Sequence, residues 1–118
     1  MKVTFKNENA KGNIEEAGIR SLQSTKEDFE QFALDELKGE EDSGFYEYGL
    51  SFDAVEDEET GEIDYHRFQL SWGGPSEEIR FYPSGKIEYV FLDWFSGIGF
   101  DVTEEDWAQW VHDRMLCC

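Results

Sequence analysis

Basic residues are scarce in this sequence, and one long stretch has none. The 118 residues include 10 Lys or Arg against 28 Asp or Glu, which gives a formal net charge of -18. No Lys or Arg occurs from residue 39 to residue 66. Because nucleic-acid phosphates attract Lys and Arg and repel carboxylates, we expect no direct binding to nucleic acid. The charge instead favours a cationic partner.

Long apolar segments are absent and cysteines are few, and both facts bear on the cellular location of the protein. No stretch approaches the roughly 20 apolar residues that a membrane helix needs, and residues 1–8 lack the apolar segment of a signal peptide. We therefore expect a cytoplasmic protein with no membrane contact. The two cysteines, Cys117 and Cys118, are adjacent, and adjacent cysteines rarely bridge each other. We interpret them as a reduced tail, with an intermolecular disulfide or a metal-binding tail as the alternative.

Recognisable catalytic and cofactor motifs are missing. The sequence contains no G-x-G-x-x-G, no phosphate-binding loop, no H-E-x-x-H and no paired C-x-x-C motif. His66 and His112 have no Ser or Cys nucleophile motif beside them, and we interpret both as structural. The acids of residues 57–62 do not follow the ligand spacing of an EF-hand loop, which leaves a weak surface cation site as the alternative. We predict a protein that is not an enzyme and has no cofactor and no dedicated metal site.

Core material is nevertheless ample, and one stretch is apolar on both faces. Hydrophobic residues make up 39% of the chain and aromatic residues 16%, so the length and composition fit one folded domain over residues 1–118. In an extended chain, residues 87–95 place Ile87, Tyr89 and Phe91 on one face. Val90, Leu92 and Trp94 fall on the other face. We predict a central strand with packing on both sides.

Two segments have apolar residues at helical spacing. A capping-box pattern at Thr25 and Asp28 precedes the first segment and predicts a helix over residues 26–38. A second such pattern at Thr103 and Asp106 predicts a helix over residues 104–115. The apolar residues of the two stripes are Phe29, Phe32, Ala33, Leu37, Trp107, Trp110, Val111 and Met115.

Alternating residues predict the sheet. Residues 44–95 are expected to form a four-stranded antiparallel meander, with strands over residues 46–53, 63–72, 77–82 and 86–95 and an end at residues 96–99. A change of parity between Tyr65 and Phe68 indicates a β-bulge near His66 and Arg67, or else a strand that starts only at Arg67. Val3 and Phe5 indicate a further short strand. The fold class is α+β, with either one helix on each face of the sheet, or both on one face and a homodimer covering the other.

The acids of the basic-poor stretch are the candidate binding residues. Alternate residues of a strand project on the same side at about 6.6–6.8 Å, and phosphates advance by about 3.4 Å along one strand of DNA. Carboxylates at i and i+2, such as Glu62 with Asp64, therefore roughly match every second phosphate, and Glu47 and Asp53, six residues apart, project on the same side of their strand. The candidate residues for binding a partner are Glu40, Glu41, Asp42, Glu47, Asp53, Glu56, Asp57, Glu58, Glu59, Glu62 and Asp64.

Three segments, residues 46–53, 70–78 and 92–95, resemble small acidic proteins of phages and plasmids, the group that includes anti-CRISPR and antirestriction inhibitors. The resemblance covers less than half the chain and assigns no binding residue. It implies an inhibitor, monomeric or homodimeric, that blocks a basic nucleic-acid-binding defence complex or nuclease by charge mimicry. The alternative is an immunity protein or a small non-catalytic interaction module with a solvated acidic face.

Overall fold

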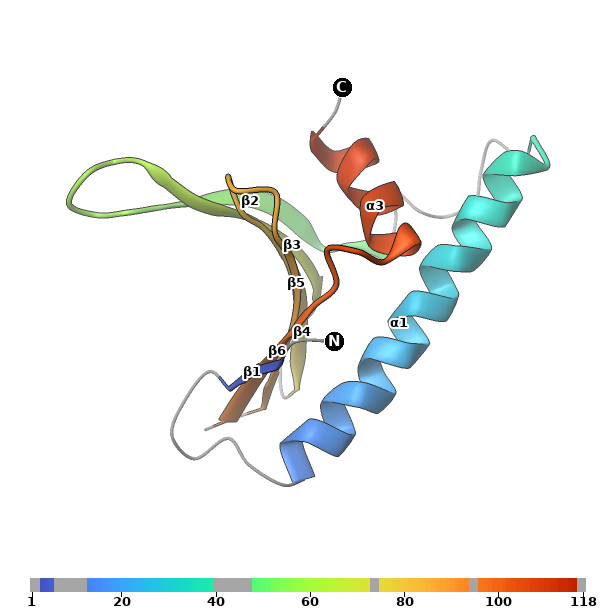
Figure 1. The fold of residues 1–118 in the computed structure, drawn as a ribbon, viewed down its shortest axis with the longest axis horizontal. Coiled ribbons are helices and arrows are strands. Elements are labelled where there is room, and N and C mark those ends of the chain that lie inside the picture. The colour runs from blue at the N-terminus through green and yellow to red at the C-terminus, as the bar shows by residue number, and fades with distance from the viewer. Residues whose placement is uncertain (1–2, 6–12, 40–47, 73–74, 94–95, 117–118) are drawn as a thin grey trace.

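A computed structural model of the chain describes residues 3–5, 13–39, 48–72, 75–93 and 96–116. It shows an α+β fold in which two helices pack on an antiparallel sheet (Figure 1). The sheet has six strands in the order β1-β6-β5-β4-β3-β2. The elements along the chain are β1 (Val3–Phe5), α1 (Asn13–Leu37), β2 (Ser51–Glu56), β3 (Ile63–Ser71), β4 (Ser76–Phe81), β5 (Ile87–Asp93), β6 (Ser96–Asp101) and α3 (Asp106–Leu116).

The sheet is larger than the predicted four-stranded meander. The prediction of an end at residues 96–99 is wrong, because β6 runs through them and pairs with β5. Gly97 and Gly99 suggested a break, but both are buried and lie opposite Leu92 and Val90. The expected strand at Val3 is confirmed, and it pairs with β6 as β1. The expected strand over residues 46–53 begins only at residue 51 in the described part of the chain, which leaves out residues 46 and 47.

The first helix is much longer than predicted. It starts at Asn13 rather than at residue 26, because Gly18 does not interrupt it. A Cβ at Gly18 would lie 3.0 Å from side-chain atoms of both Ile98 and Phe100, so glycine allows α1 to approach β6 closely. The capping-box prediction at Thr25 is therefore wrong, since Thr25 is a buried residue in the middle of α1.

The second predicted helix is confirmed, with a shifted start. Helix α3 begins at Asp106 rather than at residue 104. Thr103 does not act as its cap. The Thr103 hydroxyl accepts a hydrogen bond from the backbone N–H of Ile87 at 2.9 Å and donates one to Asp101 Oδ1 at 2.6 Å. Thr103 thus ties β5 to the segment that leads into α3.

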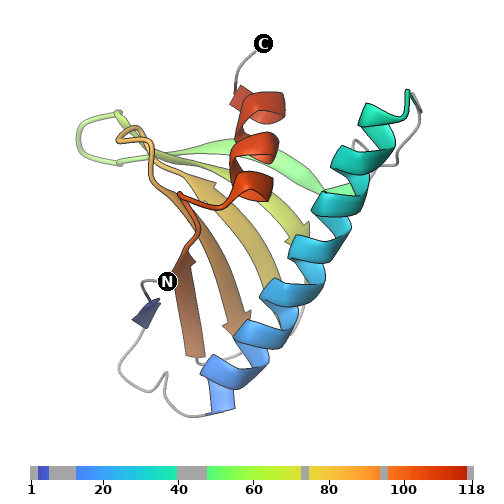
Figure 2. The same ribbon diagram turned by 45° about the vertical axis from the view of Figure 1, so that its right-hand side comes forward.

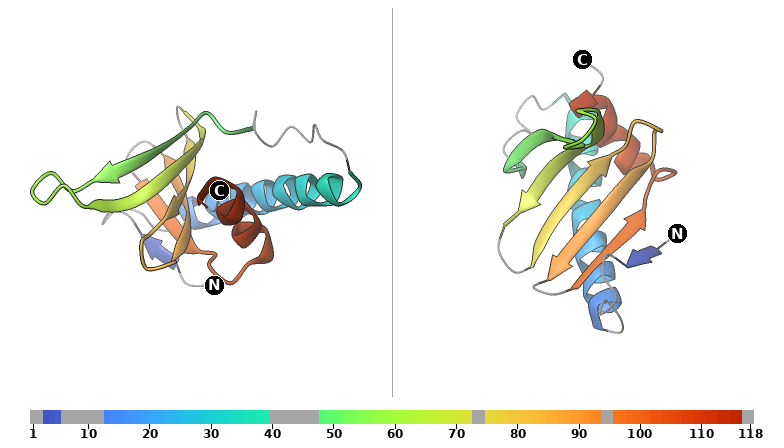
Figure 3. Two further views of the ribbon diagram at one scale, coloured as in Figure 1. Left: turned by 90° about the horizontal axis from the view of Figure 1, so that it is seen from above. Right: turned by 90° about the vertical axis from the view of Figure 1, so that its left-hand side faces the viewer.

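Both helices lie on the same face of the sheet (Figures 1 and 3). Helix α1 crosses the sheet diagonally (Figure 2) and contacts β5, β6 and α3. The arrangement with one helix on each face is therefore wrong, and the homodimer that belonged to the other arrangement stays a prediction. None of the helices in the described ranges has the length and apolarity that crossing a bilayer requires.

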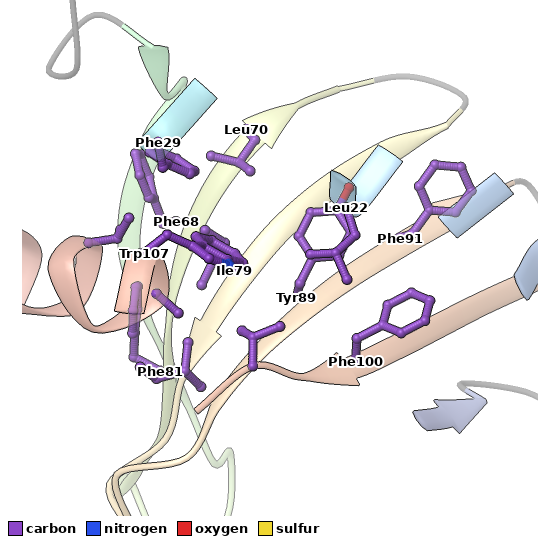
Figure 4. Close-up of a cluster of buried hydrophobic side chains, with 14 of the residues drawn as sticks. Leu22, Phe29, Phe68, Leu70, Ile79, Phe81, Tyr89, Phe91, Phe100 and Trp107 are labelled. Carbon is purple, nitrogen blue, oxygen red and sulfur yellow. The ribbon is translucent and has the colours of Figure 1, made fainter. Parts of the chain in front are cut away.

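The core lies between the helices and this covered face (Figure 4). One row of register partners, Phe100, Tyr89, Ile79 and Phe68, runs across four strands and is buried. Phe29 of α1 stacks on Trp107 of α3, with ring centroids 5.8 Å apart. Strand β5 lies inside the strand order of the sheet, and its residues Ile87, Tyr89 and Val90 are buried. The prediction of a central strand at this place is therefore confirmed.

A polar cluster joins α1 to the sheet within this core. The Tyr89 hydroxyl donates to Glu77 Oε1 at 2.6 Å, and the Ser21 hydroxyl of α1 donates to the same oxygen. Burial and the hydrogen bond to Glu77 hold the pKa of Tyr89 far above its usual range. The phenol therefore stays protonated and satisfies the carboxylate. Because a buried polar group without a partner destabilises the fold, this cluster fixes where α1 crosses the sheet.

Candidate functional site

The β2–β3 hairpin extends beyond the rest of the sheet and away from both helices (Figures 1 and 3). Its turn is built around Asp57. Asp57 Oδ1 accepts backbone N–H groups of Glu59 at 2.8 Å and Thr60 at 3.0 Å. Gly61 adopts a positive φ of 74° and donates its N–H to the Asp57 carbonyl at 2.8 Å. The sequence therefore encodes a rigid turn at the end of the hairpin.

Asp57 consequently has a structural role among the candidate acids. The hydrogen bonds from the N–H groups of Thr60 and Glu59 favour its ionised form and hold the pKa of Asp57 below its usual range. A depressed pKa makes the turn more stable above the unfolded-state pKa of about 3.9. This contribution is lost as the pH falls through the folded-state pKa.

We expect Asp57→Ala to loosen the hairpin turn and Asp57→Asn to preserve it, because the Asn side-chain oxygen accepts the same two N–H groups. The measurement is amide hydrogen exchange at Glu59 and Thr60, compared with amides of β5. Faster exchange at the turn in the Ala variant alone is the expected result. Equal exchange in both variants and the unmodified protein would show that Asp57 does not hold the turn.

Five carboxylates of the hairpin are exposed and carry no ion pair. Their side chains make no hydrogen bond or salt bridge with any other described residue. They lie on the end of β2, on the turn and at the start of β3, so they surround the tip of the hairpin. The five residues are Glu56, Glu58, Glu59, Glu62 and Asp64.

The basic side chains that follow the hairpin in the sequence are already paired with other carboxylates. Arg67 donates to both carboxylate oxygens of Asp53, at 3.2 and 2.8 Å, and Arg80 pairs with Glu78 at 2.7 Å. Asp53 is thus the candidate whose charge is offset within the chain. Further towards the C-terminus, Lys86 pairs with Glu88 at 3.8 Å and Arg114 pairs with Glu36.

Several of these charged side chains belong to one cross-strand row of the sheet, which does not include Arg114 and Glu36 of the helices. Asp53, Arg67, Arg80, Glu88 and Asp101 are successive register partners from β2 to β6. Asp53 with Arg67 and Arg80 with Glu88 are register partners of opposite charge, which attract one another, whereas Arg67 with Arg80 and Glu88 with Asp101 are partners of like charge. The row therefore combines acids and bases, whereas the tip of the hairpin carries acids alone.

The structure brings together part of the predicted set. The hairpin gathers Asp53, Glu56, Asp57, Glu58, Glu59, Glu62 and Asp64. Glu40, Glu41, Asp42 and Glu47 lie outside the described residues.

A change of register alters the spacing of two of these acids. The β2–β3 register shifts between Val55 and Glu56, which pair with Tyr65 and Ile63. Asp64 is therefore the extra residue of β3, and the side chains change faces of the sheet there. The prediction of a bulge at His66 and Arg67 is wrong. Because the bulge interrupts the alternation, Glu62 and Asp64 do not form a regular i, i+2 pair.

Exposed apolar side chains on the hairpin were missed by the sequence patterns. Phe52 is 36% exposed and Ile63 is 41% exposed. Alternation with polar residues is typical of a half-buried strand, but the hairpin extends past the helices. The signal that could have indicated exposure is their closeness to the acidic turn. Apolar and acidic groups are therefore available together on this element.

The two histidines, His66 on β3 and His112 on α3, both lie against aromatic rings. The His66 ring stacks on Phe52 with centroids 5.7 Å apart, and the His112 ring meets the Phe81 ring edge-on at 5.7 Å. Neither ring has a described hydrogen bond to a nucleophilic side chain. Within the described ranges, no three His, Cys, Asp or Glu side chains are grouped closely enough to hold a metal ion.

Comparisons with known proteins do not indicate a function, so the function has to be argued from the surface of the protein. No family model, no curated protein and no solved structure matches this chain. The projecting hairpin, its uncompensated acids and its exposed apolar residues are the features from which a function has to be argued.

Proposed function

We propose that this protein is an acidic inhibitor of the anti-CRISPR or antirestriction type. It binds a basic nucleic-acid-binding protein, either a defence complex or a nuclease, and blocks the nucleic-acid site by charge mimicry. The observation that carries the proposal is the hairpin tip, where Glu56, Glu58, Glu59, Glu62 and Asp64 are exposed without a described cationic partner. We expect the protein to act in the cytoplasm.

The shape of the hairpin suits the groove in which a basic partner protein binds nucleic acid. Two strands lie about 4.8 Å apart, so the hairpin is thin enough to enter a channel lined by Lys and Arg. Its turn is held by Asp57 and Gly61, which limits the loss of conformational freedom on binding. The mimicry is of charge density rather than of exact phosphate spacing, because the bulge at Asp64 breaks the regular alternation.

The strength of such binding comes from several weak contacts acting together. A single exposed ion pair contributes about 0.2–1 kcal/mol. The five acids share one small region, and a Debye length of about 8 Å at physiological salt allows their potentials to add. Their combined field steers a basic partner and is weakened by salt.

A second candidate is an immunity protein or another non-catalytic interaction module. The exposed Phe52 and Ile63 favour it, because protein interfaces bury apolar anchors while acids at the rim contribute little. Such a complex resists salt, whereas one based on charge mimicry dissociates as salt increases.

Affinity purification tests the proposal. Tagged protein is incubated with a lysate that contains defence complexes and nucleases, at about 50 and about 500 mM salt to vary screening. We expect recovery of a nucleic-acid-binding complex at low salt, loss at high salt, and displacement by added DNA or RNA. A partner that is retained at high salt and not displaced by nucleic acid would overturn charge mimicry in favour of the interaction module.

A further inference from the structure

Within the described residues, β2 forms one outer edge of the sheet. In the strand order β2 is terminal and pairs with β3 alone. Ser51, Phe52, Asp53 and Ala54 are all exposed, so none of the described segments covers their side chains. A terminal strand turns part of its backbone N–H and C=O groups away from its neighbour, and these groups can pair with another extended chain.

Natural proteins protect such edges, and the protection of β2 consists of the acids Asp53 and Glu56 and a bulge near its end. Lys, Pro and very short strands are common protective devices. Strand β2 contains six residues, none of them Lys or Pro. The opposite edge is formed by β1, which contains three residues. The bulge at Asp64 affects only the end of β2 near the turn, so the segment from Ser51 to Val55 remains regular.

Charge decides which chain can pair with this edge. A second copy would bring two acidic hairpins side by side, and like charges across neighbouring strands are unfavourable. The hairpin has seven acids and no Lys or Arg from residue 51 to residue 66. A strand that carries Lys or Arg instead gains attraction from Glu56 and from the carboxylates of the turn.

We propose that the β2 edge binds an extended, Lys- or Arg-rich strand of the partner and adds it to the sheet. This inference rests on the proposed function and specifies how the hairpin engages a basic protein. Backbone hydrogen bonds along β2 orient the strand, and the acids of the hairpin select its charge. Phe52 provides an exposed apolar contact beside the edge.

The probe is an acetylated and amidated peptide of alternating Lys and Val, six residues long. Its control has the same sequence but is N-methylated at every amide, which keeps the charges and removes every backbone donor. Binding is followed by NMR chemical-shift changes of the amides of β2, with amides of β6 as the internal reference. We expect changes along β2, and binding at least about tenfold weaker for the methylated peptide, since several hydrogen bonds are lost.

Three results would overturn the inference. Equal affinity for both peptides would mean that charge alone attracts them. Peptide-induced changes that leave out β2 would place the binding elsewhere. Changes at β2 that depend on protein concentration without peptide would identify a second copy as the occupant. The proposed function is judged separately by the salt-dependent purification, so its failure and the failure of strand addition are distinguishable.

Discussion

Substituting Glu58, Glu59 and Glu62 together with Gln is expected to weaken partner binding by about 3- to 150-fold, because three exposed ion pairs of about 0.2–1 kcal/mol each are removed. The fold should be unaffected, since these side chains make no hydrogen bond with the described residues. Affinity is measured by titration against the purified partner at constant salt. The variant should also show a weaker dependence of affinity on salt.

A matched variant separates the local charge of the hairpin from the total charge of the protein. Glu16, Glu27 and Glu30 are exposed on α1, and replacing them with Gln also removes three negative charges from the protein. We expect this control to bind the partner nearly as well as the unmodified protein. Equal weakening in both variants would mean that net charge, not the hairpin, attracts the partner. No weakening in either would remove the hairpin tip from the interface.

Asp57 is left out of this comparison because its carboxylate holds the turn. A variant that neutralises Asp57 changes charge and hairpin geometry at once. The sequence alone grouped Asp57 with its acidic neighbours, since a turn-forming acid and a free acid look identical there. The hydrogen bonds to Glu59 and Thr60 make the distinction.

Local patterns predicted most of the elements, and they failed where packing overrides local preference. Alternation located β4 and β5, and helical spacing located α3. Gly18 lies inside α1, where the absence of a side chain lets the helix approach β6. Gly97 and Gly99 similarly lie inside a buried strand. Single-sequence reasoning cannot detect these contacts, because the partner residues are distant in the sequence.

The candidate site was predicted in composition but not in geometry. The absence of Lys and Arg in residues 39–66 identified the acidic hairpin. The sequence did not reveal that Arg67 offsets Asp53, because that pair depends on the register between β2 and β3. It also placed the bulge wrongly, and the bulge decides which acids share a face. Register is a tertiary property, fixed by turn geometry and by which residues are buried.

Phe29→Ala is expected to destabilise the protein by about 3–5 kcal/mol, the usual cost of removing a fully buried phenylalanine. Phe29 is 0% exposed. Its ring lies 5.8 Å from the Trp107 ring of α3 and 5.1 Å from the Tyr48 ring. It also lies 6.4 Å from the Phe68 ring of β3. One side chain therefore connects α1 to α3 and to the sheet. Urea unfolding followed by tryptophan fluorescence and circular dichroism measures the loss.

A second substitution on the same helix provides the control for helix propensity. Leu37 lies at the end of α1 and is 84% exposed, so Leu37→Ala should change the free energy of unfolding by less than about 0.5 kcal/mol. Phe29→Leu keeps part of the buried volume and should fall between the two Ala variants. If Phe29→Ala matched Leu37→Ala, α1 would not be anchored on α3 and the sheet at this point. The attachment of α1 to the sheet would then depend on the cluster of Ser21, Glu77 and Tyr89. In that case Tyr89→Phe would lower the free energy of unfolding more than Phe29→Ala does.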